Sequence, residues 1–148
     1  MKTNWILVAN QAEAQFYSSG QVPKNLMLVA TMVNEMGAAH SRDLVSDAPG
    51  RAFDRVGSAR HSMEPNVGVK QEQRRRFVKE MVERLEKAHS KGDFDQLVLL
   101  AAPAVLGIIR KTLPADLVNS VVKEIPKDVI GQGVDKIQSQ LDRAFALA

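Results

Sequence analysis

The fold is decided by the stretch Phe94-Asp95-Gln96-Leu97-Val98-Leu99-Leu100-Ala101-Ala102-Pro103. From Leu97 to Ala102 no polar residue interrupts it, and Gly92 and Pro103 bound it. A short apolar run without polar/apolar alternation is typical of a strand that is buried on both faces, as central parallel strands are. Pro103 suits the first turn of a helix, where its missing N–H leaves no hydrogen bond unmade. The sequence therefore predicts a buried strand followed at once by a helix, which is half of a βαβ unit.

Three further strands are predicted in the N-terminal part of the chain. They run from Asn4 to Asn10, from Ala14 to Ser18 and from Leu26 to Val33. The connections between them are short, and short connections favour antiparallel neighbours. We therefore expect these three strands to form an antiparallel meander.

Apolar residues at helical spacing predict three helices in the rest of the chain. They run from Gln71 to Ser90, from Pro103 to Leu113, and over the C-terminus from near Asp128 or Gly133. A fifth strand is predicted from Ser120 to Ile125. The element order is then βββαβαβα.

This order predicts an α/β fold with ribonuclease H-like topology. Right-handed crossovers place the fourth strand parallel to the first and beside it, with the fifth strand outside it. The result is a mixed five-stranded sheet in the order 3-2-1-4-5 with helices packed on it. With 148 residues, 45% hydrophobic and 25% charged, the chain is expected to form a single domain over residues 1–148. Ligands of such sheets bind beyond the carboxyl ends of the central strands, here near Asn10, Gln11, Ala102 and Pro103.

Residues 34–70 are predicted to form a long Gly/Arg-rich loop, because they show no apolar period and contain several glycines and prolines. We expect its first half, through about Arg51, to lie against the domain through Leu44 and Val45. The second half, Phe53 to Gly68, is expected to be mobile until a partner binds.

The excess positive charge of the chain lies in one segment. Gly37 to Arg76 holds eight Lys/Arg against five Asp/Glu, which accounts for the whole formal charge of +3. A solvated charge run explains this pattern as well as a binding surface does. However, arginines in the first turns of a helix oppose its dipole, which favours an anionic partner, and guanidinium pairs with phosphate bidentately. The candidate anion- or RNA-binding residues are Arg51, Arg55, Arg60, Arg74, Arg75 and Arg76.

No catalytic constellation is recognisable, so the sequence leaves open whether the protein is an enzyme. The chain has no cysteine, its three histidines are far apart, and it contains no Walker loop, dinucleotide fingerprint or Gly-x-Ser-x-Gly elbow. No metal site or cofactor is predicted. A metal-dependent nuclease on this fold needs carboxylates where the first and fourth strands end, and the chain has Asn10 and Ala102 there. In the remaining enzyme hypothesis, a hydrolase of ester bonds in RNA or nucleotides, His61 is the general base and Asn10 orients the substrate.

The N-terminus predicts a cytoplasmic protein. Only five apolar residues, Trp5 to Ala9, follow Met1-Lys2-Thr3-Asn4, which is too short for a signal-peptide core or a membrane span. The lack of cysteine fits a reducing compartment. The oligomeric state is not indicated.

Three stretches of the chain resemble the bacterial host-attachment protein family. They are Asn4 to Asn10 with Phe16; Arg42-Asp43-Leu44-Val45-Ser46-Asp47-Ala48-Pro49-Gly50-Arg51 with Gly57, Arg60 and His61; and Phe94 to Leu99 with Ala102-Pro103, Leu106-Gly107 and Arg110. The loop motif consists of Arg42, Asp43, Asp47, Pro49, Gly50 and Gly57. The resemblance implies a part in attaching bacteria to host cells, through a protein or polysaccharide partner.

That family in turn resembles the middle domain of archaeo-eukaryotic peptide-chain release factors, which has the fold class predicted above. In those proteins a loop before the first long helix carries a Gly-Gly-Gln motif into the ribosome. In this chain Gly57-Ser58-Ala59-Arg60-His61 stands at that position instead. The resemblance implies an RNA or ribosome-like partner.

Overall fold

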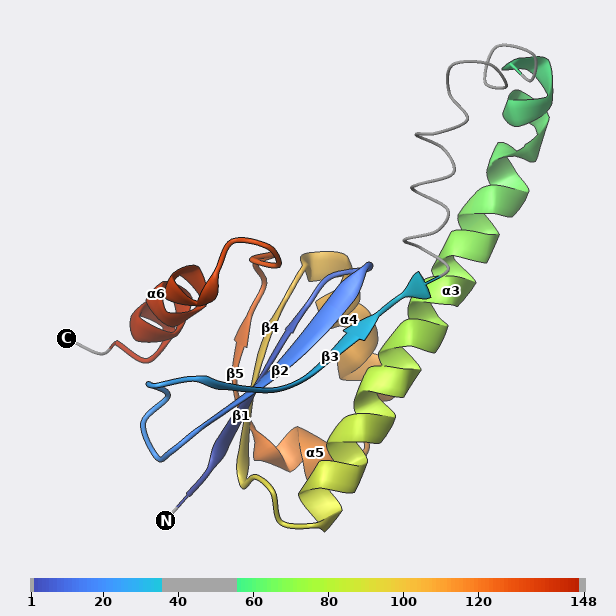
Figure 1. The fold of residues 1–148 in the computed structure, drawn as a ribbon. Helices are drawn as coiled ribbons and strands as arrows, with labels where there is room; N and C mark the ends of the chain where they lie inside the picture. The colour runs from blue at the N-terminus through green and yellow to red at the C-terminus, as the bar shows by residue number, and fades with distance from the viewer. Residues whose placement is uncertain (1, 36–55, 147–148) are drawn as a thin grey trace.

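The structure, a computed structural model, describes residues 2–35 and 56–146, with backbone only for 56–67. A mixed five-stranded sheet forms its centre (Figure 1). Its strands are β1 (Asn4–Ala9), β2 (Glu13–Ser19), β3 (Met27–Val33), β4 (Gln96–Ala101) and β5 (Val121–Ile125). Their order is β3-β2-β1-β4-β5, with β1 antiparallel to β2 and parallel to β4. The predicted fold class and strand order are confirmed.

The two central strands carry the core. All six residues of β1 are buried, and β4 is buried from Leu97 to Ala101. Their parallel register places Leu7 opposite Leu99. The apolar run from which the fold was predicted is therefore buried on both faces, as its lack of alternation indicated.

Helices cover both faces of this sheet. They are α3 (Val56–Ser90), α4 (Pro103–Thr112), α5 (Ala115–Ser120) and α6 (Val134–Ala144). Successive residues of a strand point to opposite faces. Accordingly Trp5 and Leu7 belong to the core with α3, α4 and α5, whereas Ile6 and Val8 pack with α6. Figure 1 shows α6 on one side of the sheet and α3 and α5 on the other.

The predicted start of the long helix is wrong. α3 begins at Val56 instead of Gln71, so most of the segment expected to be mobile, Phe53 to Gly68, is helical. An apolar period appears only where a helix has a core to face. Phe77 is the first buried residue described in α3, and the helix before it extends beyond the sheet (Figure 1). The rest of the predicted loop, residues 36–55, lies outside the described residues.

Helix α5 was also missed. It occupies Ala115–Ser120 between α4 and β5, so β5 begins at Val121 instead of Ser120. One turn and a half is too short for an apolar period to be recognised, and only Leu117 and Ser120 of α5 are buried.

Candidate anion-binding groove

A groove with a positively charged lining runs between α3 and α4. Its volume is about 470 Å³. Four of its lining residues are Lys or Arg, and none is Asp or Glu. The lining residues are Gln71, Arg74, Arg75, Lys79, Ala104, Ile108, Lys111 and Thr112.

Helical spacing brings these side chains to one side. Gln71, Arg75 and Lys79 lie four residues apart along α3 and so form a stripe, with Arg74 beside it. The opposite stripe of α3 is buried against the sheet, which fixes the orientation of the helix. Buried residues also fix the orientation of α4, because Val105 and Ile109 pack in the core and direct Lys111 away from it. The positions of the cations are therefore set by the packing of two helices.

Arg74 is the most informative residue of the groove. The side chain is partly buried, and its Nε is fully buried with no hydrogen-bond partner in the described part of the chain. A buried N–H without an acceptor costs roughly 1–3 kcal/mol, and more for a charged group. For an anionic oxygen bound in the groove to supply that acceptor, the Arg74 side chain has to turn its Nε toward the groove.

The other cations of the groove have weaker ties. Arg75 contacts Glu72 at 3.6 Å, but both side chains are more than half exposed, so the pair contributes little. Lys79 and Lys111 form no ion pair with any described residue. Lys111 also lies in the last turn of α4, where a cation is favourable without any ligand. Arg110 beside it is paired with Glu124 and is not among the residues that line the groove.

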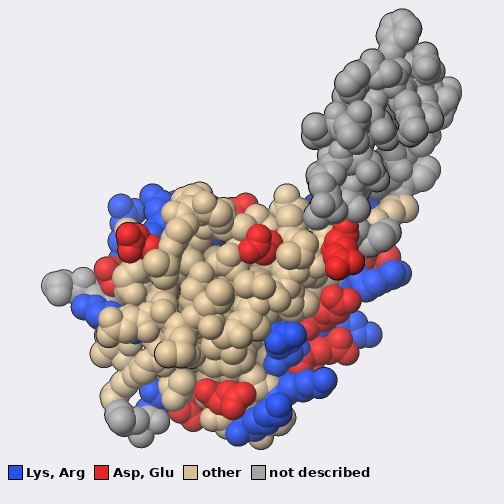
Figure 2. Space-filling model, viewed as in Figure 1, with Lys and Arg blue, Asp and Glu red and all other residues tan. Residues whose placement is uncertain are grey.

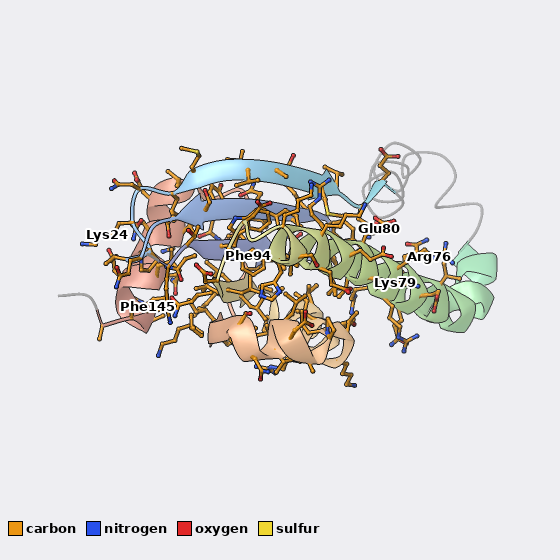
Figure 3. All side chains as sticks on the ribbon, turned by 90° about the horizontal axis from the view of Figure 1, so that it is seen from below. Lys24, Arg76, Lys79, Glu80, Phe94 and Phe145 are labelled. Carbon is orange, nitrogen blue, oxygen red and sulfur yellow. The ribbon has the colours of Figure 1, made fainter. Side chains whose placement is uncertain are left out.

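The three consecutive arginines do not lie in the first turns of the helix as predicted, because α3 begins at Val56, and they do not act as one cluster. Arg74 and Arg75 line the groove, whereas Arg76 lines a separate hollow of about 320 Å³ near β3. Consecutive helical residues diverge by about 100°. Figure 3 shows the same divergence about one turn further along α3, where Lys79 points toward α4 and Glu80 toward β3.

The remaining predicted binding residues are not brought into the groove by the described structure. Arg60 and His61 lie in α3, but their side chains are outside the description, and Gly57 lies in the first turn of the helix. The others lie in the segment that is not described: Arg42, Asp43, Asp47, Pro49, Gly50, Arg51 and Arg55. Their roles, and that of His61 as a general base, stay predictions.

Asn10 lies at the carboxyl end of β1, as predicted, and its side chain is engaged in hydrogen bonds. Its Oδ1 accepts from the backbone N–H groups of Ala12 and Glu13 at 2.8 and 2.9 Å. Its Nδ2 donates to both carboxylate oxygens of Asp128 at 3.2 Å. Asn10 thus ties the β1–β2 turn to the connection after β5, which is a structural role that the sequence did not reveal.

A second constellation, also missed, joins Ser120, His89 and Asp116. The Ser120 Oγ lies 3.2 Å from His89 Nε2, and His89 Nδ1 lies 3.7 Å from Asp116 Oδ2. This resembles a nucleophile, base and acid in order. However, the Ser120 hydroxyl also lies 3.2 Å from the Asp116 backbone oxygen, which competes with the histidine for its single proton. The contact therefore serves to join the end of α3 to α5.

Two further features concern the described residues as a whole. No three potential ligands among His, Asp and Glu converge there on a point that could hold a metal ion. No helix in residues 2–35 or 56–146 combines the length and apolar character needed to cross a bilayer.

Comparison with known proteins places the chain in a family. The sequence profile of the family described as "Protein required for attachment to host cells" matches residues 5–141. The chain belongs to this family. It is also similar to "Uncharacterized protein RP470" of Rickettsia prowazekii (strain Madrid E), with 29% identity over 77 residues. That match covers 51% of this chain and 51% of the relative, so the aligned part is about half of each.

Proposed function

We propose that this member of the host-attachment family is a binding module for an anionic, RNA-containing partner in the cytoplasm. In this proposal the groove between α3 and α4 holds phosphate groups of the partner. The observation that supports it most is the buried Arg74 Nε, which has no acceptor in the described part of the chain.

Phosphate suits the groove better than an isolated carboxylate does. Two guanidinium groups can each donate two parallel hydrogen bonds to phosphate oxygens, and two ammonium groups add charge without fixed geometry. Groove cations spread over two helices can also meet more than one phosphate. A polymer of phosphates therefore matches the site, and the resemblance to release factors supports RNA as its source. Arg51, Arg55 and Arg60 stay predicted contacts of the same RNA, and their side chains lie outside the described part of the chain.

Salt dependence of RNA binding tests the proposal. Affinity for a fluorescently labelled single-stranded RNA is measured by anisotropy at several salt concentrations. Each phosphate contact on a single strand contributes about −0.7 to the slope of log K against log salt. We expect Arg74→Ala and Lys111→Ala to weaken binding and each to flatten that slope by about this amount.

Arg76→Ala is the matched control, because it removes the same charge from the opposite side of α3. It should leave the slope nearly unchanged. The proposal is contradicted if RNA does not bind, if binding ignores salt, or if Arg76→Ala weakens it as much as Arg74→Ala. Circular dichroism of each variant excludes loss of the fold as the cause.

Family membership supports a second candidate, an interaction with a protein or polysaccharide during attachment to host cells. Fractionation of bacteria that produce the protein separates the two. A protein found in the cytoplasm supports the RNA-binding proposal, whereas a protein found only on the cell surface contradicts it and supports direct attachment.

A further inference from the structure

The β3 edge of the sheet is long, apolar and uncharged. β3 has seven residues, Met27–Val33, without a charged residue or proline. It lies at the end of the strand order, so no strand in the described part of the chain pairs with its outer side. Four of its large apolar side chains are exposed, namely Met27 by 68%, Leu28 by 52%, Val29 by 47% and Val33 by 55%. Natural edge strands are usually protected against pairing by charges, prolines or short length.

The opposite edge of the sheet shows such protection. β5 has five residues and carries Lys123 and Glu124, and Glu124 is paired with Arg110 of α4. Figure 2 shows few charged side chains over β2 and β3, with acidic and basic side chains along α3 beside them. The two edges therefore differ in kind, and β3 has the features of an edge that receives a strand.

A bulge in β3 leaves most of this edge regular. Ala30 pairs with Phe16 and Leu28 with Tyr17, so Val29 is the extra residue. From Ala30 to Val33 the register with β2 advances residue by residue. In that half the outward N–H and C=O groups pair with no strand of residues 2–35 or 56–146, so another strand can bind them.

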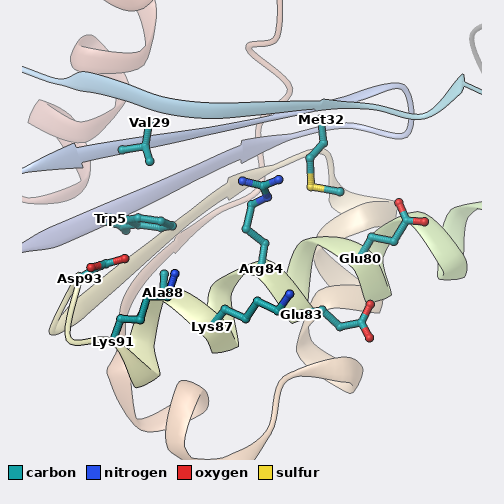
Figure 4. A pocket seen from close by; sticks show the side chains of 10 residues that line it. All are labelled: Trp5, Val29, Met32, Glu80, Glu83, Arg84, Lys87, Ala88, Lys91 and Asp93. Atoms are coloured by element: carbon teal, nitrogen blue, oxygen red, sulfur yellow. The ribbon is translucent and has the colours of Figure 1, made fainter.

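The charges on α3 beside β3 are arranged with acids at one end and bases at the other. A hollow of about 550 Å³ lies between β3 and α3, and Figure 4 shows the side chains that line it. In chain order the charged ones are Glu80, Glu83, Arg84 and Lys87 of α3, followed by Lys91 and Asp93 just beyond the end of the helix at Ser90. Ion pairs with a described residue are absent for Glu80, Glu83, Lys87 and Lys91. Arg84 instead stacks over the Phe16 ring, at 5.8 Å from its centroid.

We propose that two copies of this chain pair through β3, antiparallel, about a two-fold axis near Thr31. The pairing supplies partners for the outward N–H and C=O groups of β3 and covers the flanks of its exposed apolar side chains. A two-fold axis also makes the two α3 helices antiparallel. Glu80 and Glu83 of one copy then face Lys91 and Lys87 of the other, so the surface is complementary to itself.

This interface does not depend on the anion-binding proposal. The groove of Arg74 and Lys111 lies on the α4 side of α3, whereas the interface uses the β3 side. In the dimer, therefore, the described residues of the partner copy do not cover either groove.

Sedimentation of the full chain tests the interface. At about 100 µM the protein is expected to sediment as a dimer that dissociates on dilution. Thr31→Lys places two like charges opposite each other on the axis and should weaken association at least about tenfold. Val122→Lys introduces the same charge on the β5 edge, at a residue that is also exposed, and should leave the dimer unchanged. A monomeric wild type, an assembly larger than a dimer, or equal effects of the two lysines would overturn the proposal.

Charge reversal on α3 tests the orientation of the two copies. Glu83→Lys and Lys87→Glu should each weaken the dimer, because each brings like charges together across the axis. The double variant restores opposite charges in both contacts and should recover the dimer. If it does not, while its urea stability matches that of the wild type, the antiparallel arrangement is wrong.

Discussion

The hydrogen bonds of single side chains separate residues that stabilise the fold from candidate binding residues. Asn10 has acceptors and donors within reach for both ends of its amide, so its interactions are internal. Arg74 has a buried Nε with no acceptor among the described residues, so its interactions are incomplete. The sequence named both as candidate site residues, and only their surroundings in the structure distinguish the residue with satisfied hydrogen bonds from the one with an unsatisfied Nε.

Asn10→Ala should therefore act on stability. The change leaves the Ala12 and Glu13 N–H groups without their acceptor, and we expect a loss of about 1–3 kcal/mol in the free energy of unfolding by urea. Gln11→Ala, at the exposed neighbouring position, should change it by less than about 0.5 kcal/mol. An Asn10→Ala protein of normal stability that loses an activity would instead support the substrate-orienting role.

Tyr17 should make stability depend on pH in the alkaline range. Burial, aided by the Glu13 carboxylate, raises the pKa of Tyr17 above its ordinary value of 10.0. The folded state then holds its proton at a pH where the unfolded state has lost it. The contribution is complete below pH 10.0 and is lost as the pH rises through the higher folded value.

Tyr17 is the single tyrosine of the chain, so ultraviolet absorbance reports its titration directly. We expect a midpoint above 10.0 in the folded protein. Tyr17→Phe should remove the corresponding part of the alkaline loss of stability. A midpoint at or below the ordinary value would show that the ring is not buried as described.

At the scale of the elements, the sequence predicted those helices and strands whose buried residues form a continuous or periodic apolar pattern. The β1 and β4 strands and the packed part of α3 carry continuous or periodic apolar residues, and their order fixed the sheet. The first turns of α3 carry no such pattern, and α5 is too short to show one although its Leu117 is buried in the core. The groove escaped prediction for another reason, since Lys111 is distant in sequence from Arg74 and Lys79 and only the packing of α4 against α3 brings it to them.

Gly68→Ala tests the helical extension of α3, and Gly131→Ala, in the turn before α6, serves as a contrast. Gly68 lies within α3 with open space where a Cβ would stand, so Gly68→Ala should stabilise the helix by about 1 kcal/mol. Gly131 is equally open but has φ +82, so Gly131→Ala should cost roughly 1–2 kcal/mol through backbone strain. Hydrogen exchange of the α3 amides and urea unfolding measure the two effects. If Gly68→Ala lowers protection around Val69, the helix does not extend as described.

At the scale of the whole molecule, α3 separates two surfaces of different chemistry. Its α4 side presents a groove of cations without acids, and its β3 side presents an apolar edge with balanced charges. The two proposed functions, anion binding and self-association, therefore use opposite sides of one helix. A dimer through β3 would present two grooves to a single polymer, and linked contacts bind more tightly than separate ones.

The central claim, that Arg74 binds phosphate in the α3–α4 groove, is tested most directly by the NMR signal of its Nε–H during an RNA titration. Arg74→Lys identifies the signal by removing it. We predict that the signal shifts as RNA is added, that the shift saturates with the affinity measured by anisotropy, and that high salt reverses it. An Arg74 Nε–H signal that stays unchanged while RNA binds to the protein would contradict the claim.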